Sequence, residues 1–179
     1  MGSAPIVITA GSGICLSGEE KGCPKVYDNV GLDVLFGLKN EALSLAVHGG
    51  VDALSFDALT LQLRAGLLGR LSIGKNLTLA FDPRILVGLT ERDFNKEAVD
   101  LPAWLWFDIS TTLSVYLHSG ISAPFDGFAD SFAIPVQAGA SFKVSEKLTV
   151  GGDFSFPNLL GKGSSSDSRT LGIRAAFAI

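Results

Sequence analysis

The chain alternates between hydrophobic and polar positions with a period of two residues over long stretches. Between residues 59 and 73, the odd-numbered positions are all apolar or glycine, whereas the even-numbered ones carry Thr, Gln, Arg and Ser with one glycine and one leucine among them. After residues 74–76 the alternation resumes and runs to residue 90. Successive side chains of a β-strand point to opposite faces. The pattern therefore predicts a hairpin with one apolar face and one ionic face.

The same alternation predicts about ten strands along the chain. The predicted strands cover residues 5–16, 26–38, 43–56, 59–73, 77–90, 101–109, 113–125, 132–144, 148–156 and 169–179. Residues 91–100 and 126–131 are expected to form loops, and most other connections are short polar turns. A count of eight or twelve strands would follow if residues 43–73 or 101–125 were divided differently.

Nearly all charged residues of these strands lie on one face, although charged residues make up 18% of the chain. That face carries basic and acidic groups in similar numbers, at Asp33, Asp52, Arg64, Arg70, Asp82, Arg84, Asp108, Lys143, Asp153 and Arg174. Ions of both signs at similar heights favour a paired network over a solvated surface of a single sign.

Two kinds of barrel produce two such faces. A soluble barrel that binds a hydrophobic ligand would turn the apolar face inward, but its narrow interior could not hold Leu or Phe at every inward position. A membrane barrel turns that face toward lipid and the ionic face toward the lumen. We therefore predict an all-β fold: one transmembrane antiparallel up-and-down β-barrel domain over residues 1–179. The soluble barrel remains an alternative.

Composition narrows the classes further. The chain is 47% hydrophobic with a mean hydropathy of +0.38, yet no run of 18 apolar residues is present, which excludes a transmembrane helix. A net charge of −4 gives no electrostatic case for nucleic-acid binding. Cys15 and Cys23 flank a polar stretch, and this spacing predicts a disulfide in an oxidising compartment; two free thiols are the alternative.

The last predicted strand carries a polar residue, a glycine and then apolar residues that end in an aromatic, from Thr170 to Phe177. This resembles the C-terminal assembly signal of bacterial outer-membrane β-barrel proteins, except that Ala178 and Ile179 follow the aromatic. The resemblance implies the outer membrane as location, the lipid bilayer and the barrel-assembly machinery as partners, and periplasmic termini. Trp104, Trp106, Tyr27 and Tyr116, together with the phenylalanines, are the expected aromatic girdles.

Two patterns could carry chemistry. The stretch Gly69 to Lys75 matches most of a P-loop, but Asn76 stands where Ser or Thr should bind magnesium, and a β-turn cannot cradle phosphate. His48 and His118 each fall five residues after the start of a predicted strand, and Asp82 lies at a matching depth. A His–carboxylate pair could serve as a general base, although a histidine bonded within the ionic network is the more common arrangement.

These observations favour an integral outer-membrane barrel without chemistry of its own. It would be structural or a narrow pore for small ions or solutes, with a lumen lined by Arg and Asp. An outer-membrane enzyme that uses His48 or His118 is the second hypothesis. No cofactor or metal is expected, because the two histidines and two cysteines lack metal-ligand spacing.

Overall fold

The computed structural model describes residues 5–17, 26–39, 43–56, 59–162 and 166–179. The first six strands are β1 (Ile6–Ser17), β2 (Val26–Lys39), β3 (Leu43–Ser55), β4 (Thr60–Ile73), β5 (Leu77–Phe81) and β6 (Arg84–Gly88). They are followed by β7 (Ala98–Asp108), β8 (Leu113–Pro124), a one-turn helix α1 (Phe128–Ser131), β9 (Val136–Lys143), β10 (Leu148–Phe156) and β11 (Arg169–Ala178). Within the described residues, no helix is long and apolar enough to cross a membrane.

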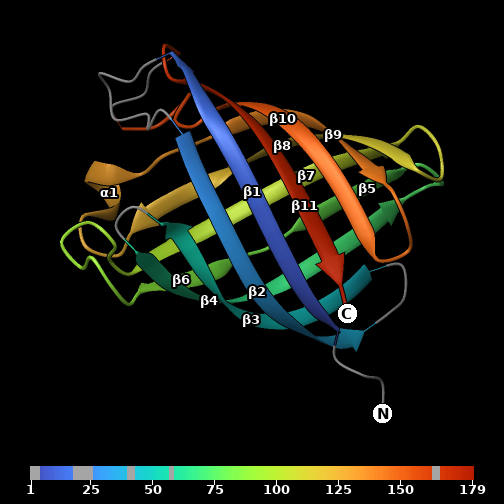
Figure 1. Cartoon of the computed structure of the whole chain (residues 1–179), viewed down its shortest axis with the longest axis horizontal. Helices are drawn as coiled ribbons and strands as arrows, with labels where there is room; N and C mark the ends of the chain where they lie inside the picture. Colours follow the sequence, from blue (N-terminus) through green and yellow to red (C-terminus); the bar gives the residue numbers. More distant parts are fainter. Residues whose placement is uncertain (1–4, 18–25, 40–42, 57–58, 163–165) are drawn as a thin grey trace.

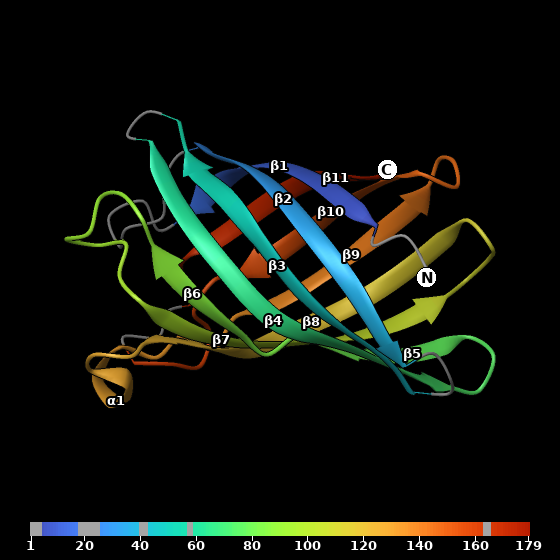
Figure 2. The same cartoon turned by 90° about the horizontal axis from the view of Figure 1, so that it is seen from below.

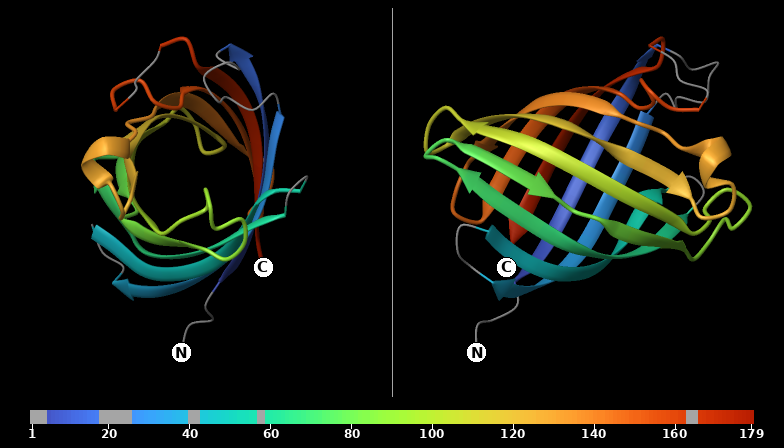
Figure 3. Two further views of the ribbon diagram at one scale, coloured as in Figure 1. Left: turned by 90° about the vertical axis from the view of Figure 1, so that its left-hand side faces the viewer. Right: turned by 180° about the vertical axis from the view of Figure 1, so that it is seen from behind.

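The strands form one closed antiparallel barrel in which neighbours in sequence are neighbours in space (Figure 1). β1 pairs with β11, and this pairing joins the first and last strands of the sheet. β5 and β6 both lie between β4 and β7, so together they fill one of ten strand positions around the ring. Seen end-on, the strands form a closed ring (Figure 3, left). The predicted all-β barrel of ten strands is confirmed.

The predicted strand over residues 77–90 is interrupted at Asp82 and Pro83, which separate β5 from β6. Proline lacks an N–H group and cannot donate to the ladder. The hydrogen bonding nevertheless continues on both sides, because Leu67 N donates to Pro83 O over 3.1 Å and Asp82 N donates to Pro102 O over 3.0 Å. The interruption therefore does not open the barrel wall.

Two predicted boundaries are wrong. β7 begins at Ala98, so part of the predicted loop 91–100 belongs to a strand. β9 begins at Val136 instead of residue 132, because α1 and an isolated bridge between Ser122 and Ala133 occupy the preceding segment. In the first case, the alternation of apolar and polar positions does extend back to Ala98. The polar residues directly before Ala98 are typical of a loop, and they make the start of the strand hard to locate from the sequence.

The two ends of the barrel differ (Figures 1 and 2). At one end, here called the turn end, tight turns at residues 74–76, 110–112 and 145–147 lie beside the C-terminus, where Ile179 N donates to Ile6 O over 2.9 Å. At the other, the loop end, lie the connection between β6 and β7 and the helix α1. The side of the membrane that each end faces stays a prediction.

The outer face of the wall is hydrophobic and exposed. Large exposed side chains include Ile173 (67%), Leu117 (58%) and Phe36 (55%). Buried hydrophobic residues are few by contrast: in the described part of the chain they are Ala80, Tyr116 and Ala123. An inside-out distribution of this kind suits a hydrocarbon solvent, in which a closed ladder also satisfies the backbone groups.

The predicted disulfide joins Cys15 and Cys23. Cys15 lies in β1, whereas Cys23 lies outside the described residues, so the pairing stays a prediction.

Candidate functional site

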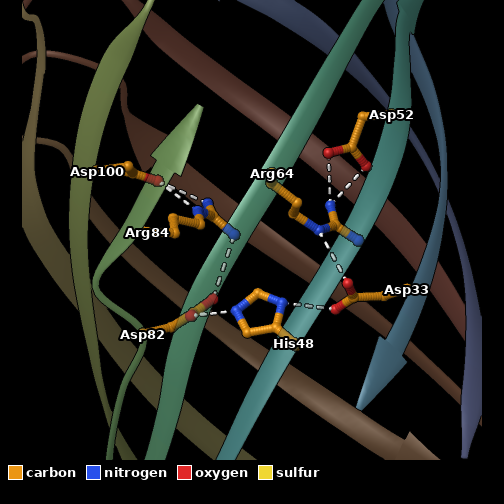
Figure 4. Close-up of polar contacts among 7 residues, drawn as sticks. All are labelled: Asp33, His48, Asp52, Arg64, Asp82, Arg84 and Asp100. Atoms are coloured by element: carbon orange, nitrogen blue, oxygen red, sulfur yellow. Dashed lines mark hydrogen bonds and ion pairs between the residues drawn. The ribbon is translucent and has the colours of Figure 1, made fainter. Parts of the chain in front are cut away.

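Seven charged or titratable residues form one continuous network on the inner face of the barrel (Figure 4). We call Asp52, Arg64, Asp33, His48, Asp82, Arg84 and Asp100 the charged network. In this order each residue contacts the next, from β3 and β4 through β2 and the β5–β6 junction to β7. The network therefore ties together the strands of one half of the ring.

His48 lies at the centre of the network, between two carboxylates. Its Nδ1 lies 2.9 Å from Asp33 Oδ2, and its Nε2 lies 2.7 Å from Asp82 Oδ1. Of the other six members, four are carboxylates and two are arginines, and each arginine lies between two carboxylates.

The two arginines complete the network on either side of His48. Arg64 Nη1 donates to both carboxylate oxygens of Asp52, over 2.5 and 2.6 Å. Its Nε lies 3.6 Å from Asp33 Oδ1, too far for a hydrogen bond. Arg84 donates to Asp100 Oδ2 from Nε over 2.9 Å and from Nη2 over 2.6 Å, and its Nη1 lies 3.4 Å from Asp82 Oδ2.

A glycine makes room for the central contact. Gly66 of β4 pairs in register with His48 on one side and Arg84 on the other. A Cβ at Gly66 would lie 2.5 Å from His48 Nε2 and 2.8 Å from Arg84 Cβ. The side chains of β3 and of the β5–β6 junction can meet across β4 because the residue between them has no side chain.

The network is packed. Side-chain exposure ranges from 4% for His48 to 26% for Arg84. Removing one partner from a pair of this kind leaves an uncompensated charge, which costs about 3–5 kcal/mol in a buried site. The alternating arrangement avoids that cost by giving every carboxylate a cationic neighbour.

The structure does not join all the predicted lumen residues into this network. Asp108, at the turn end of β7, and Asp153 of β10 lie apart from the network, where they accept from Ser114 Oγ over 2.5 Å and from Tyr116 Oη over 3.2 Å respectively. Arg174 of β11 places its guanidinium 4.5 Å from the centre of the Tyr116 ring, a cation–π contact. Arg70 and Lys143 are exposed near strand ends that lie at the turn end.

The expected aromatic girdle is wrong for Trp104, Trp106 and Tyr116. Trp104 stacks on His118 with ring centres 4.8 Å apart, and Trp106 lies 4.6 Å from Tyr116. These four residues share the inner face, opposite the exposed Leu105 and Leu117. The side chain of Tyr27 lies outside the described residues.

Asp100 is the member of the network that the sequence analysis missed. The sequence predicts a loop over residues 91–100, but Asp100 lies in β7 and pairs in register with Arg84. The available signal was the alternation Val99, Leu101, Ala103, which already places Asp100 on the opposite, ionic face.

The predicted pair of His48 and Asp82 is present, and Asp33 contacts the second ring nitrogen, so both nitrogens lie against carboxylates. A role of this pair as a general base stays a prediction. His118 lies apart from this pair, against Trp104. Among the described residues, no three His, Cys, Asp or Glu side chains are grouped as a metal site.

Comparison with known proteins places this barrel in a structural class. No protein-family model matches the sequence, and neither does any curated protein. A KdgM porin solved in complex with disordered oligogalacturonate aligns with a TM-score of 0.62 at 10% identity, over 98% of this chain and 99% of the porin. The fold is that of outer-membrane porins. A NanC porin aligns equally well, with a TM-score of 0.62 at 8% identity, over 99% of this chain and all of the porin.

The likeness confirms the predicted β-barrel fold of outer-membrane porins, and the exposed hydrophobic outer face agrees with the predicted place in the bacterial outer membrane. The likeness does not narrow the chain to a subfamily.

Proposed function

We propose that this protein is a narrow passive channel of the outer membrane and that the charged network forms a constriction in its lumen. The observation that carries the proposal is the continuous series of contacts from Asp52 to Asp100 across the inner face. Rings and clusters of charged side chains set selectivity in pores by acting on ions at close range. Small ions or solutes would pass beside the network, with the bilayer around the outer face.

The same network also supports a structural function, in which the pairs fill and rigidify the barrel. Its low exposure is what this second candidate rests on. The two candidates differ in one observable, because only the channel carries current. Recognition of the C-terminal strand by the barrel-assembly machinery is part of the proposal under either candidate.

The test is single-channel recording of the refolded protein in a planar bilayer, with insertion checked independently by protease protection. We expect discrete current steps whose ion selectivity changes in Arg84→Gln and Asp100→Asn, since each substitution removes the ion pair between these two residues and changes the net charge of the network by one. Asp126→Asn is the matched control, because Asp126 is an exposed loop residue outside the network.

Two results would overturn the channel. Confirmed insertion without current in the wild type and in both network variants would show a filled barrel and favour the structural candidate. Current steps with equal selectivity in Arg84→Gln, Asp100→Asn and Asp126→Asn would show a pore that the network does not control.

A further inference from the structure

The connection between β6 and β7, residues 89–97, folds onto the inner face of the barrel. Asn95 is buried, with 7% exposure, whereas Phe94 beside it is 67% exposed. Gly88, the last residue of β6, pairs with Gln62 on the inner face. A Cβ at Gly88 would collide with the backbone oxygen of Asn95, so the loop crosses directly over this inner-face position. We call residues 89–97 the mouth loop.

The mouth loop is held by several hydrogen bonds. Asn95 Nδ2 donates to Leu61 O over 2.8 Å and to Thr90 O over 2.9 Å, and Asn95 N donates to Glu91 O over 2.8 Å. The first of these bonds ties the loop to β4. Glu91 has a positive φ of 51°, which turns the chain at the base of the loop.

An ion pair between Arg92 and Glu97 links the start and the end of the mouth loop. Arg92 donates to Gly88 O from Nη1 and to Glu97 Oε1 from Nη2, each over 2.5 Å. The hydrogen bond from Arg92 lowers the pKa of the Glu97 carboxyl, which therefore stays ionised at neutral pH and keeps this contact. The loop is thus fixed at both its start and its end.

We propose that the mouth loop forms a second constriction of the pore, at the loop end, and that Asn95 determines its width. In the end-on view, the yellow-green segment between β6 and β7 projects inside the outline of the ring (Figure 3, left). Gly88 follows Arg84 by four residues on the same face, which places the two constrictions about 13 Å apart along the strand. This inference rests on the proposed channel function.

The role of Asn95 follows from what the side chain touches. A constriction formed by a loop is only as narrow as the loop is fixed. Leu89 N and Thr90 Oγ1 bond to Leu61 at the base of the mouth loop, and Asn95 supplies the bond to β4 from its far part. Without the Asn95 bond, the base of the loop stays attached to β4, but the part that crosses over Gly88 does not. The loop can then move outward and widen the entrance.

The experiment compares Asn95→Ala with Asn76→Ala in planar bilayers. Asn76 is the matched control, because its Nδ2 also donates to a backbone oxygen, that of Asp108 over 3.1 Å, but in a turn at the opposite end. We expect Asn95→Ala to raise the unitary conductance about twofold or more, with the control unchanged. Polyethylene glycols of graded size, added at the loop end, should enter the variant at larger sizes than the wild type.

The outcomes separate this inference from the channel itself. Wild-type current that Asn95→Ala leaves unchanged, in conductance and in polymer size limit, overturns the second constriction and leaves the channel standing. Absence of current in the wild type, the network variants and Asn95→Ala overturns the channel. Should Asn95→Ala fail to refold, Arg92→Gln releases the other side of the loop and is expected to raise the conductance in the same direction.

Discussion

At the scale of single residues, the charged network depends on space as much as on charge. Side chains from β3 and from the β5–β6 junction must meet over β4, and the β4 residue between them is Gly66. The contact between His48 and Asp82 at 2.7 Å passes over it. A residue with no charge and no side chain therefore positions the ionic groups around it.

Gly66→Ala is expected to destabilise the barrel by about 1–3 kcal/mol, the usual cost of forcing a methyl group into a packed site. The new Cβ would lie 2.9 Å from Pro83 O, a backbone atom that cannot move aside cheaply. Chemical unfolding in lipid vesicles, followed by tryptophan fluorescence, gives the free energy of unfolding. Gly49→Ala is the control: its Cβ would lie 3.7 Å from Arg64 O, an ordinary contact, so we expect a change within about 0.5 kcal/mol. Equal effects of the two substitutions would contradict the packing argument.

At the scale of elements, exposure has two meanings in this protein. Leu117 near the middle of β8 is 58% exposed, and Leu160 in the connection between β10 and β11 is 61% exposed. The first lies on the outer wall beside Leu105 and Ala138, where the barrel meets lipid. The second lies beyond the strands at the loop end. Equal exposure therefore corresponds to two different solvents.

Leu117→Arg is expected to cost about 2–4 kcal/mol of folding free energy in a bilayer, because a charge on the lipid face near the midplane is poorly solvated. Leu160→Arg should change the stability by less than about 0.5 kcal/mol, as a surface substitution in water does. Unfolding titrations of both variants in the same vesicles provide the comparison. A loss of stability at position 160 equal to that at position 117 would show that the outer face of β8 does not lie in lipid.

At the scale of the whole molecule, closure of the sheet is the condition for stability. β11 pairs along its length with both β1 and β10. Lipid supplies no hydrogen-bond partners, so an opened ladder leaves backbone groups that cost several kcal/mol each. The first and last strands are adjacent, and Ile179 N donates to Ile6 O. We therefore expect the ring to close even when the chain begins between two other strands.

Removal of residues 169–179 is expected to abolish folding in vesicles, measured as loss of β-sheet circular dichroism and of protease resistance. The matched variant is a circular permutant that joins residue 179 to residue 5 through a Gly/Ser linker and opens the chain at Gly127, in the connection before α1. It keeps every ladder and should fold. A folded truncation would show that closure is not required, and an unfolded permutant would show that chain order matters.

The period of two in the sequence was sufficient for the fold, because alternation is imposed by local backbone geometry. In a barrel whose strands follow one another around the ring, the order of the strands also follows from the order of the sequence. The assignment of residues to a face was equally local: parity alone places Asp100, Trp104 and Trp106 opposite Leu101 and Leu105. The errors in these assignments came from polar neighbours and from expecting tryptophans at the interface.

Tertiary structure decided which groups meet. Parity gives a face but no height, and heights are set by the register between strands, which depends on cross-strand hydrogen bonds and turns. For this reason the sequence offered Asp33 and Asp82 as lumen residues but could not show that both hold His48, or that Arg84 takes Asp100. The inward course of residues 89–97 likewise depends on tertiary contacts. Asn95 bonds to Leu61, which is distant in the sequence, and its backbone lies against Gly88.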